Sequence, residues 1–160
     1  MRDYIVDTNI VVDLETAVLL DFLNINCFHV SNLVYIEEIS KQSSWKPRDF
    51  QILKETPEDI MYAYDLHERK KKISVYDAIN ISLAKRNEYI LLTGDQQLIK
   101  QATSENVECH GIIWLLKILF ERYGVSKDEI IKGLEELISS PNRRIPKDIA
   151  LSLKKELGSK

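Results

Sequence analysis

The sequence predicts an α/β fold in which helices cover both faces of a parallel sheet, and three observations lead to this prediction. The chain has 160 residues, which is the size of one ordinary domain. Short apolar segments alternate with longer segments of helical periodicity, as they do in chains that build parallel sheets. Glycine and proline are scarce, with 5 and 4 residues, so a turn-rich β architecture is disfavoured.

The predicted strands are short, mostly apolar runs, as expected for strands that are buried on both faces. They cover residues 4–6, 27–30, 89–93 and 107–109. The run at 89–93 is the clearest, and Gly94 and Asp95 close it. Residues 45–54 have two interpretations, a connector alone or a connector followed by a short strand at 50–53.

Helical segments separate these strands, and several begin with a residue that favours a helix start. Ser31 or Asn32 begins one helix, Thr56 followed by Pro57 begins the next, and Ser74 begins a third. In chain order, helices are expected at residues 10–23, from 31 or 32 onward, at 56–70, from 74 onward, at 96–104 and at 112–123.

The pattern changes after Gly124, where two helices follow each other without a strand. Residues 126–129 form a capping box that precedes an apolar stripe, and Pro146 opens a last helix. We therefore expect an α/β domain at residues 1–124 and a C-terminal helical extension, a hairpin, at residues 125–160. Two roles stay open for the hairpin: it covers one edge of the sheet, or it binds a dimer mate or a small partner protein.

Composition excludes several classes of protein. Lys and Arg number 22 and Asp and Glu 25, so the formal net charge is −3, which excludes a uniformly basic nucleic-acid coat but not a local basic patch. Two cysteines without a CxxC motif cannot form a disulfide framework. No apolar run reaches the length of about 20 residues that a membrane span needs, and no signal peptide precedes the first strand. We expect a cytoplasmic protein without membrane attachment.

Four acidic residues are expected to meet at one edge of the sheet. Asp7 and Asp95 each follow a predicted strand, and the carboxyl ends of parallel strands lie at the same edge. Helices packed on such a sheet run antiparallel to the strands, so their first turns return to this edge. Asp77 lies in the first turn of its helix, and Glu37 lies within about two turns of the start of another.

Each of these acids also has a purely structural interpretation. Asp7 and Asp95 are preferred helix caps, and Asp77 has the spacing of a capping box with Ser74. Taken together, however, like charges at one edge repel each other unless a cation holds them. The cation that suits oxygen ligands is a hard divalent ion, Mg²⁺ or Mn²⁺.

Five segments, in chain order and spanning about residues 3–120, resemble the PIN-domain nucleases. They are residues 5–9 (IVDTN), 30–34 (VSNLV) leading to Glu37, 74–78 (SVYDA), 92–95 (LTGD) and 109–116 (CHGIIWLL). The resemblance implies a three-layer α/β/α sandwich with a central parallel sheet and an acidic Mg²⁺ or Mn²⁺ site that cleaves RNA. Carried over by position, the catalytic and metal-binding acids are Asp7, Glu37, Asp77 and Asp95.

Further implications concern the surroundings of the acids. Asn9 and Thr93 would be polar supports for them. Glu37 and Glu38 are adjacent, so the second acid is uncertain by one residue, and the spacing from Ser31 favours Glu37. No acid follows Asp95 in the next nine residues, 96–104, so the additional carboxylate of some family members is missing. A site with one firmly held metal, and a second recruited with substrate, fits this set.

The resemblance also implies a biological role, the toxin of a toxin–antitoxin pair of the VapC type. Such toxins form homodimers and are silenced by a small antitoxin protein. Two alternatives stay open, a PIN protein that processes RNA without being a toxin and a non-catalytic domain that binds RNA or another protein. A metal-dependent cleavage assay separates the enzymes from the binding domain.

Substrate binding requires positive charge beside the acids. Residues 69–72 (RKKK) lie just before Ser74 and are expected near the acidic edge, where they would contact phosphates. They are equally well interpreted as the solvated, basic end of a helix. Trp45 and Tyr76 would stack on bases or pack in the core.

Overall fold

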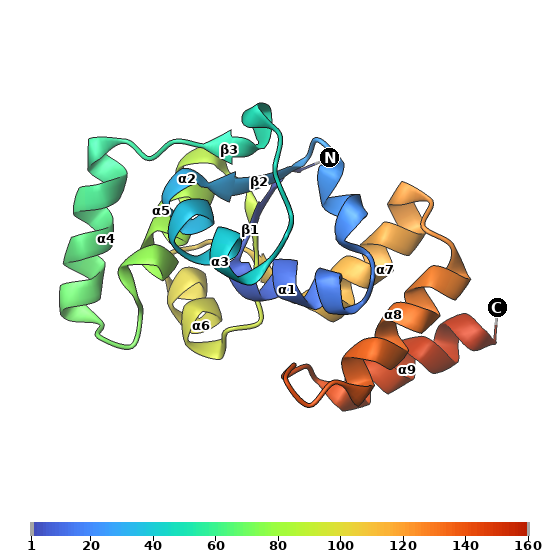
Figure 1. Cartoon of the computed structure of the whole chain (residues 1–160). Coiled ribbons are helices and arrows are strands. Elements are labelled where there is room, and N and C mark those ends of the chain that lie inside the picture. The colour runs from blue at the N-terminus through green and yellow to red at the C-terminus, as the bar shows by residue number, and fades with distance from the viewer. Residues whose placement is uncertain (1, 160) are drawn as a thin grey trace.

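The computed structural model describes residues 2–159, and its centre is a sheet of five parallel strands (Figure 1). The strand order is β3-β2-β1-β4-β5. The strands are β1 (Tyr4–Val6), β2 (Phe28–Ser31), β3 (Ile52–Leu53), β4 (Ile90–Leu92) and β5 (Cys109–His110). The predicted parallel sheet is confirmed, and residues 50–53 do contain a short strand at the edge.

Helices cover both faces of the sheet, which gives the predicted three-layer α/β/α sandwich. On one face α5 packs across β1, β2 and β4, and α4 packs on α5 (Figure 1). On the other face the rings of Trp114 and Tyr123, both in α7, contact those of Tyr4 and Phe28. The longer helices of these layers are α1 (Thr8–Thr16), α4 (Pro57–Arg69), α5 (Val75–Asn87), α6 (Gln96–Ser104) and α7 (Ile112–Tyr123).

The segment between β2 and β3 consists of short, irregular turns. It comprises α2 (Asn32–Val34), a π-helix at Tyr35–Ile39, α3 (Ser40–Gln42) and a 3₁₀ turn at Asp49–Gln51. Ser31 caps α2 by accepting a hydrogen bond from the Val34 amide. Thr56 and Ser74 cap α4 and α5 in capping boxes, as predicted.

The helix expected at residues 10–23 is interrupted. It ends at Thr16, Val18 takes a positive φ of 59°, and a 3₁₀ helix occupies Leu20–Asn24. The C-terminal hairpin packs on the interrupted segment. A Cβ on Gly133 would lie 3.0 Å from the Leu19 side chain and 3.2 Å from Ala17, so the hairpin packs closely on this break.

The hairpin consists of α8 (Lys127–Ser139) and α9 (Lys147–Gly158), which pack on each other and on the α/β layers. α8 contacts α1 and α7, and α9 contacts α7 (Figure 1). Its apolar stripe is therefore buried within this chain, in the same cluster as the core, through residues Ile130, Leu134, Leu137, Ala150, Leu153 and Leu157. No helix in residues 2–159 is both long and apolar enough to cross a membrane.

The topology defines where a site belongs. From β1 the chain moves through β2 to β3 on one side, then crosses over to β4 and β5 on the other. Open α/β sheets bind ligands outside the carboxyl ends of the strands at such a reversal of order. Here the reversal lies between β1 and β4, which are followed by Asp7 and by Thr93-Gly94-Asp95.

Candidate functional site

A small pocket of about 220 Å³ lies at this reversal point, and we call it the acid pocket. Three of the predicted acids line it, Asp7, Asp77 and Asp95, and they come from segments that follow β1, begin α5 and begin α6. The fourth acid that lines it is Glu38 and not Glu37. The full lining is Asp7, Thr8, Asn9, Glu38, Gln42, Asp77, Asp95 and Arg143.

Asp7 is buried and caps α1. Its Oδ1 accepts hydrogen bonds from the Thr8 amide at 2.9 Å and from Asn80 Nδ2 at 3.3 Å. Its Oδ2 accepts from the Thr93 hydroxyl at 2.7 Å and from Asn9 Nδ2 at 3.2 Å. Four donors thus fix the orientation of one carboxylate, so the structural role as a cap and a place in the site coexist in this residue.

Burial dominates the ionisation of Asp7. It raises the pKa from 3.8 to about 7, the hydrogen bonds from Thr93 and Thr8 oppose the shift, and the charges of Asp77 and Glu38 add to it. At neutral pH the folded protein therefore holds both the protonated and the ionised form of Asp7, whereas an ordinary carboxyl group is fully ionised there. A nearby positive charge would favour the ionised form.

Asp77 occupies the third position of α5 and completes a capping box. Its amide donates to the Ser74 hydroxyl at 3.0 Å, and its Oδ2 accepts from the Ser74 amide at 3.2 Å. Its pKa is raised to about 6, mainly by burial and in part by the charges of Asp95 and Glu38, while the hydrogen bonds from Ser74 oppose the shift. Like Asp7, Asp77 both caps a helix and faces other carboxylates.

Asp95 caps α6 through a single oxygen. Oδ1 accepts from the amides of Gln97 at 2.9 Å and Leu98 at 3.1 Å. The Asp95 amide donates to the Thr93 hydroxyl at 3.1 Å, so the same hydroxyl that bonds Asp7 also orients the start of α6. The predicted supporting residues, Asn9 and Thr93, both contact Asp7 directly.

The two adjacent glutamates point in different directions. Glu37 is exposed and pairs with Lys41 at 3.4 Å along its own helix. Glu38 is half-buried, and its Oε1 accepts from the Thr8 hydroxyl at 2.9 Å. Both residues lie in the π-helix at Tyr35–Ile39, whose wider turn changes which side chain of the segment faces the pocket, and such turns occur frequently at functional sites.

Sequence reasoning missed two further residues of the site. Asn80 is fully buried, donates to Asp7, and has an Oδ1 without a hydrogen-bond partner among the described residues. The sequence feature that could have identified Asn80 is its position three residues after Asp77, because residues about one helical turn apart lie on the same face of a helix. Arg143 reaches the acid pocket from the turn between α8 and α9, and nothing in the local sequence indicated this.

The donor set fits a hard divalent cation in its chemistry. It offers carboxylate and amide oxygens, and burial together with neighbouring carboxylates disfavours the ionised forms of Asp7 and Asp77. The unpartnered Oδ1 of Asn80 is a further oxygen beside Asp7. Across residues 2–159, no group of three or more His, Cys, Asp or Glu side chains is arranged so that it could hold a metal ion.

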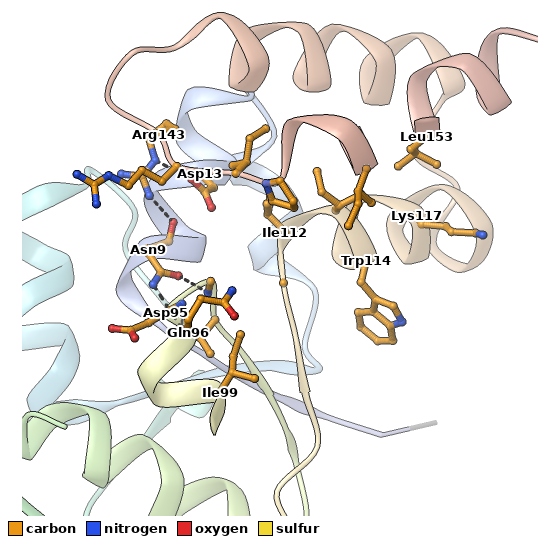
Figure 2. A pocket seen from close by; sticks show the side chains of 18 of the residues that line it. Asn9, Asp13, Asp95, Gln96, Ile99, Ile112, Trp114, Lys117, Arg143 and Leu153 are labelled. Atoms are coloured by element: carbon orange, nitrogen blue, oxygen red, sulfur yellow. Dashed lines mark hydrogen bonds and ion pairs between the residues drawn. The ribbon is translucent and has the colours of Figure 1, made fainter. Parts of the chain in front are cut away.

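A second, larger cavity of about 1,090 Å³ adjoins the acid pocket (Figure 2). The two share Asn9, Asp95 and Arg143. Its other walls are mainly apolar and come from α6, α7, the turn between α8 and α9, and α9, including Ile99, Ile112, Trp114, Ile145 and Leu153.

The residues predicted to contact nucleic acid differ in their exposure to solvent. Lys70 and Lys72 are exposed in the turn that leads from α4 to Ser74, whereas Lys71 pairs with Glu68 at 3.1 Å. Trp45 is buried and donates to Asn24 at 3.2 Å, so it is a core residue. Tyr76 is half-buried and also packs against the core.

Comparison with known proteins gives one match. The model of a family described as a PIN domain matches residues 3–159, which includes β1, the acid pocket and the α8–α9 hairpin. No protein with a curated description and no solved structure matches the chain.

Proposed function

The chain belongs to the PIN-domain family, which is a family of nucleases, and from this premise we propose that it is an Mg²⁺- or Mn²⁺-dependent endoribonuclease. The observation that supports the proposal most directly is the convergence of Asp7, Glu38, Asp77 and Asp95 on one pocket at the reversal point of the sheet. Buried carboxylates with raised pKa values are typical of functional sites.

We assign the metal ligands to the four acids that line the pocket, Asp7, Glu38, Asp77 and Asp95. Glu38 takes the place predicted for Glu37, because only Glu38 faces the other acids. A bound divalent cation would supply positive charge for an anionic phosphodiester and lower the pKa of a water molecule.

The chain's own residues prepare the site for this chemistry. Thr93, Asn9 and Asn80 hold the Asp7 carboxylate in one orientation by donating to it. Thr8 does the same for Glu38. Because these donors are fixed by strand ends and helix starts, the carboxylates are oriented before substrate arrives, which reduces the reorganisation needed during reaction.

Substrate binding is assigned to the basic turn at residues 69–72. Lys70 and Lys72 are exposed there, a few residues before Asp77 in the chain. Flexible ammonium groups at this place suit contacts with the phosphates of a single strand and carry no sequence preference.

We further propose that the protein acts in the cytoplasm as a homodimeric toxin that a small antitoxin protein inhibits. This part rests on the resemblance of the acid-bearing segments to toxins of the VapC type. A PIN protein that processes RNA without being a toxin has the same site chemistry. An antitoxin-like reading frame next to the gene, and growth arrest on expression without it, would support the toxin.

Metal-dependent cleavage tests the nuclease itself. Purified protein should cut single-stranded RNA with Mn²⁺ or Mg²⁺, and excess chelator should stop it. Cleavage that continues undiminished in chelator would contradict the metal mechanism. RNA binding without any cleavage under either ion would favour the non-catalytic binding domain.

A further inference from the structure

Arg143 occupies an unusual position for a residue of the C-terminal extension. Among the residues that line the acid pocket it is the only Lys or Arg, and it also lines the large cavity. Figure 2 shows it coming from the turn between α8 and α9 toward Asn9 and Asp13 of α1, with Asp95 beyond Asn9. A single cation therefore lies where the two cavities join.

The guanidinium group is held in place by two contacts with α1. Its Nε donates to Asp13 Oδ1 at 2.6 Å, and its Nη2 donates to the Asn9 carbonyl oxygen at 3.0 Å. The Arg143 side chain keeps 19% of its surface exposed. Within residues 2–159 its Nη1 has no hydrogen-bond partner, so one side of the guanidinium remains available to a ligand.

The buried ion pair between Arg143 and Asp13 carries a desolvation penalty, so it is an unfavourable way to attach the turn between α8 and α9 to α1. Asp13 is 4% exposed, and burial raises the pKa of its carboxyl group although Arg143 opposes the shift. Well-packed apolar side chains of similar volume commonly stabilise a protein as much as a buried ion pair does. Anchoring the turn therefore does not by itself explain an arginine at this position.

The surroundings indicate an anionic ligand. A phosphodiester that approaches Asp7, Asp77 and Asp95 meets repulsion from the carboxylates, and Arg143 is the cation placed at the pocket itself. The guanidinium group binds phosphate through parallel N–H donors and stays charged at every relevant pH. The adjoining cavity, with mainly apolar walls, has room for the strand on one side of that phosphate.

We infer that Arg143 binds a phosphate group of the RNA strand where the acid pocket meets the large cavity, and that Asp13 is a positioning residue that orients it. This inference rests on the proposed ribonuclease function and adds a substrate-binding role for the C-terminal hairpin. It also distinguishes two kinds of basic residue: Arg143, which is fixed beside the acids, and the exposed lysines at 70 and 72.

The test separates phosphate binding from attachment of the turn. One variant is Arg143→Gln. The second is the double variant Asp13→Leu with Arg143→Met, which replaces the ion pair with apolar side chains and should preserve the melting temperature. The control is Arg122→Gln, an exposed arginine near Tyr4, at the opposite end of β1 from Asp7.

Binding is measured with a labelled single-stranded RNA oligonucleotide in chelator, over a range of salt concentrations. Without divalent ions, cleavage stops and the contribution of Arg143 remains. Both Arg143 variants should bind about tenfold more weakly. Their slope of log Kd against log salt should fall by about 0.7, which corresponds to one phosphate fewer bound on a single strand. The control should keep the wild-type slope.

The outcomes distinguish this inference from the proposed function. If the double variant is folded and binds RNA with the wild-type affinity and slope, Arg143 only anchors the turn and the inference is wrong. Wild-type protein could cleave RNA with Mn²⁺ but bind it too weakly to measure in chelator, in which case the KM for cleavage is compared between wild type and the double variant. A raised KM in the double variant supports the inference, and an unchanged KM overturns it. If wild-type protein neither binds nor cleaves RNA, the proposed function fails first.

Discussion

Replacing Asp77 with Asn should make the metal-free protein more stable and inactive at the same time. Asn keeps the size of the side chain and an oxygen that can accept from the Ser74 amide, so the capping box of α5 survives. What disappears is a negative charge that is largely buried and faces Asp95 and Glu38.

The pKa of Asp77 gives the size of the effect. It rises from 3.8 to about 6 in the folded protein, a difference of about two units. At about 1.4 kcal/mol per unit, the ionised carboxylate lowers the free energy of unfolding by about 3 kcal/mol. For a chain of this size, removing that cost should raise Tm by roughly 6–12 °C.

The effect has a defined pH window. A group with a raised carboxyl pKa contributes its full stability below the unfolded value of about 4 and loses it as pH rises toward 6. The variant and the wild type should therefore be equally stable near pH 4. Their difference should grow between pH 4 and 6 and stay constant above that range.

The assay is thermal or urea unfolding in chelator at several pH values. Glu129→Gln is the matched control, because Glu129 holds the same third position in the capping box of α8 but is exposed to solvent. It should change Tm little at any pH. An Asp77→Asn protein that is less stable than wild type at pH 8, or that still cleaves RNA, would refute the reasoning.

Two further predictions concern residues around the same pocket. Glu38→Gln should abolish metal-dependent cleavage, while Glu37→Gln should leave it near the wild-type level, because only Glu38 lines the pocket. The reverse result in the cleavage assay would show that Glu37 is the site acid. Replacing lysines 70, 71 and 72 with Gln should weaken RNA binding and lower its salt slope by up to about 2, at about 0.7 for each phosphate that the turn no longer binds. A titration that gives an unchanged slope would show that this turn is solvated surface only.

Most of the fold follows from local signals in the sequence. Thr56, Ser74 and Ser126 begin helices where their side chains accept from the amide three residues later. The apolar run that contains β4 is buried on both faces, as its composition indicates. These features depend on neighbours in the chain, so one sequence is enough to predict them.

The features that sequence reasoning missed depend on contacts between distant segments. The segment after Thr16, where the helix ends, is contacted by Gly133 of α8 at Ala17 and Leu19. Arg143 reaches the pocket because it pairs with Asp13, 130 residues away in the chain. Neither contact leaves a periodic or capping pattern that could be recognised locally.

The sequence also could not decide which of the adjacent residues Glu37 and Glu38 faces the pocket. Spacing along an ideal helix presumes a constant rotation per residue, and the π-helix at Tyr35–Ile39 departs from it. A difference of one residue then decides whether a carboxylate faces Lys41 in solvent or Thr8 in the pocket.

Asp7 links the stability of the fold to the function proposed for it. Four donors favour its ionised form, yet burial outweighs them and brings its pKa to about 7. Near neutral pH, about half of the metal-free molecules therefore carry a proton on this carboxylate. A cation that binds through Asp7 must displace that proton, so its affinity should increase with pH up to about 7 and then level off. The burial of ionised carboxylates, together with their mutual repulsion, lowers the stability of the metal-free fold. A divalent ion would offset both effects, and binding it would restore that stability.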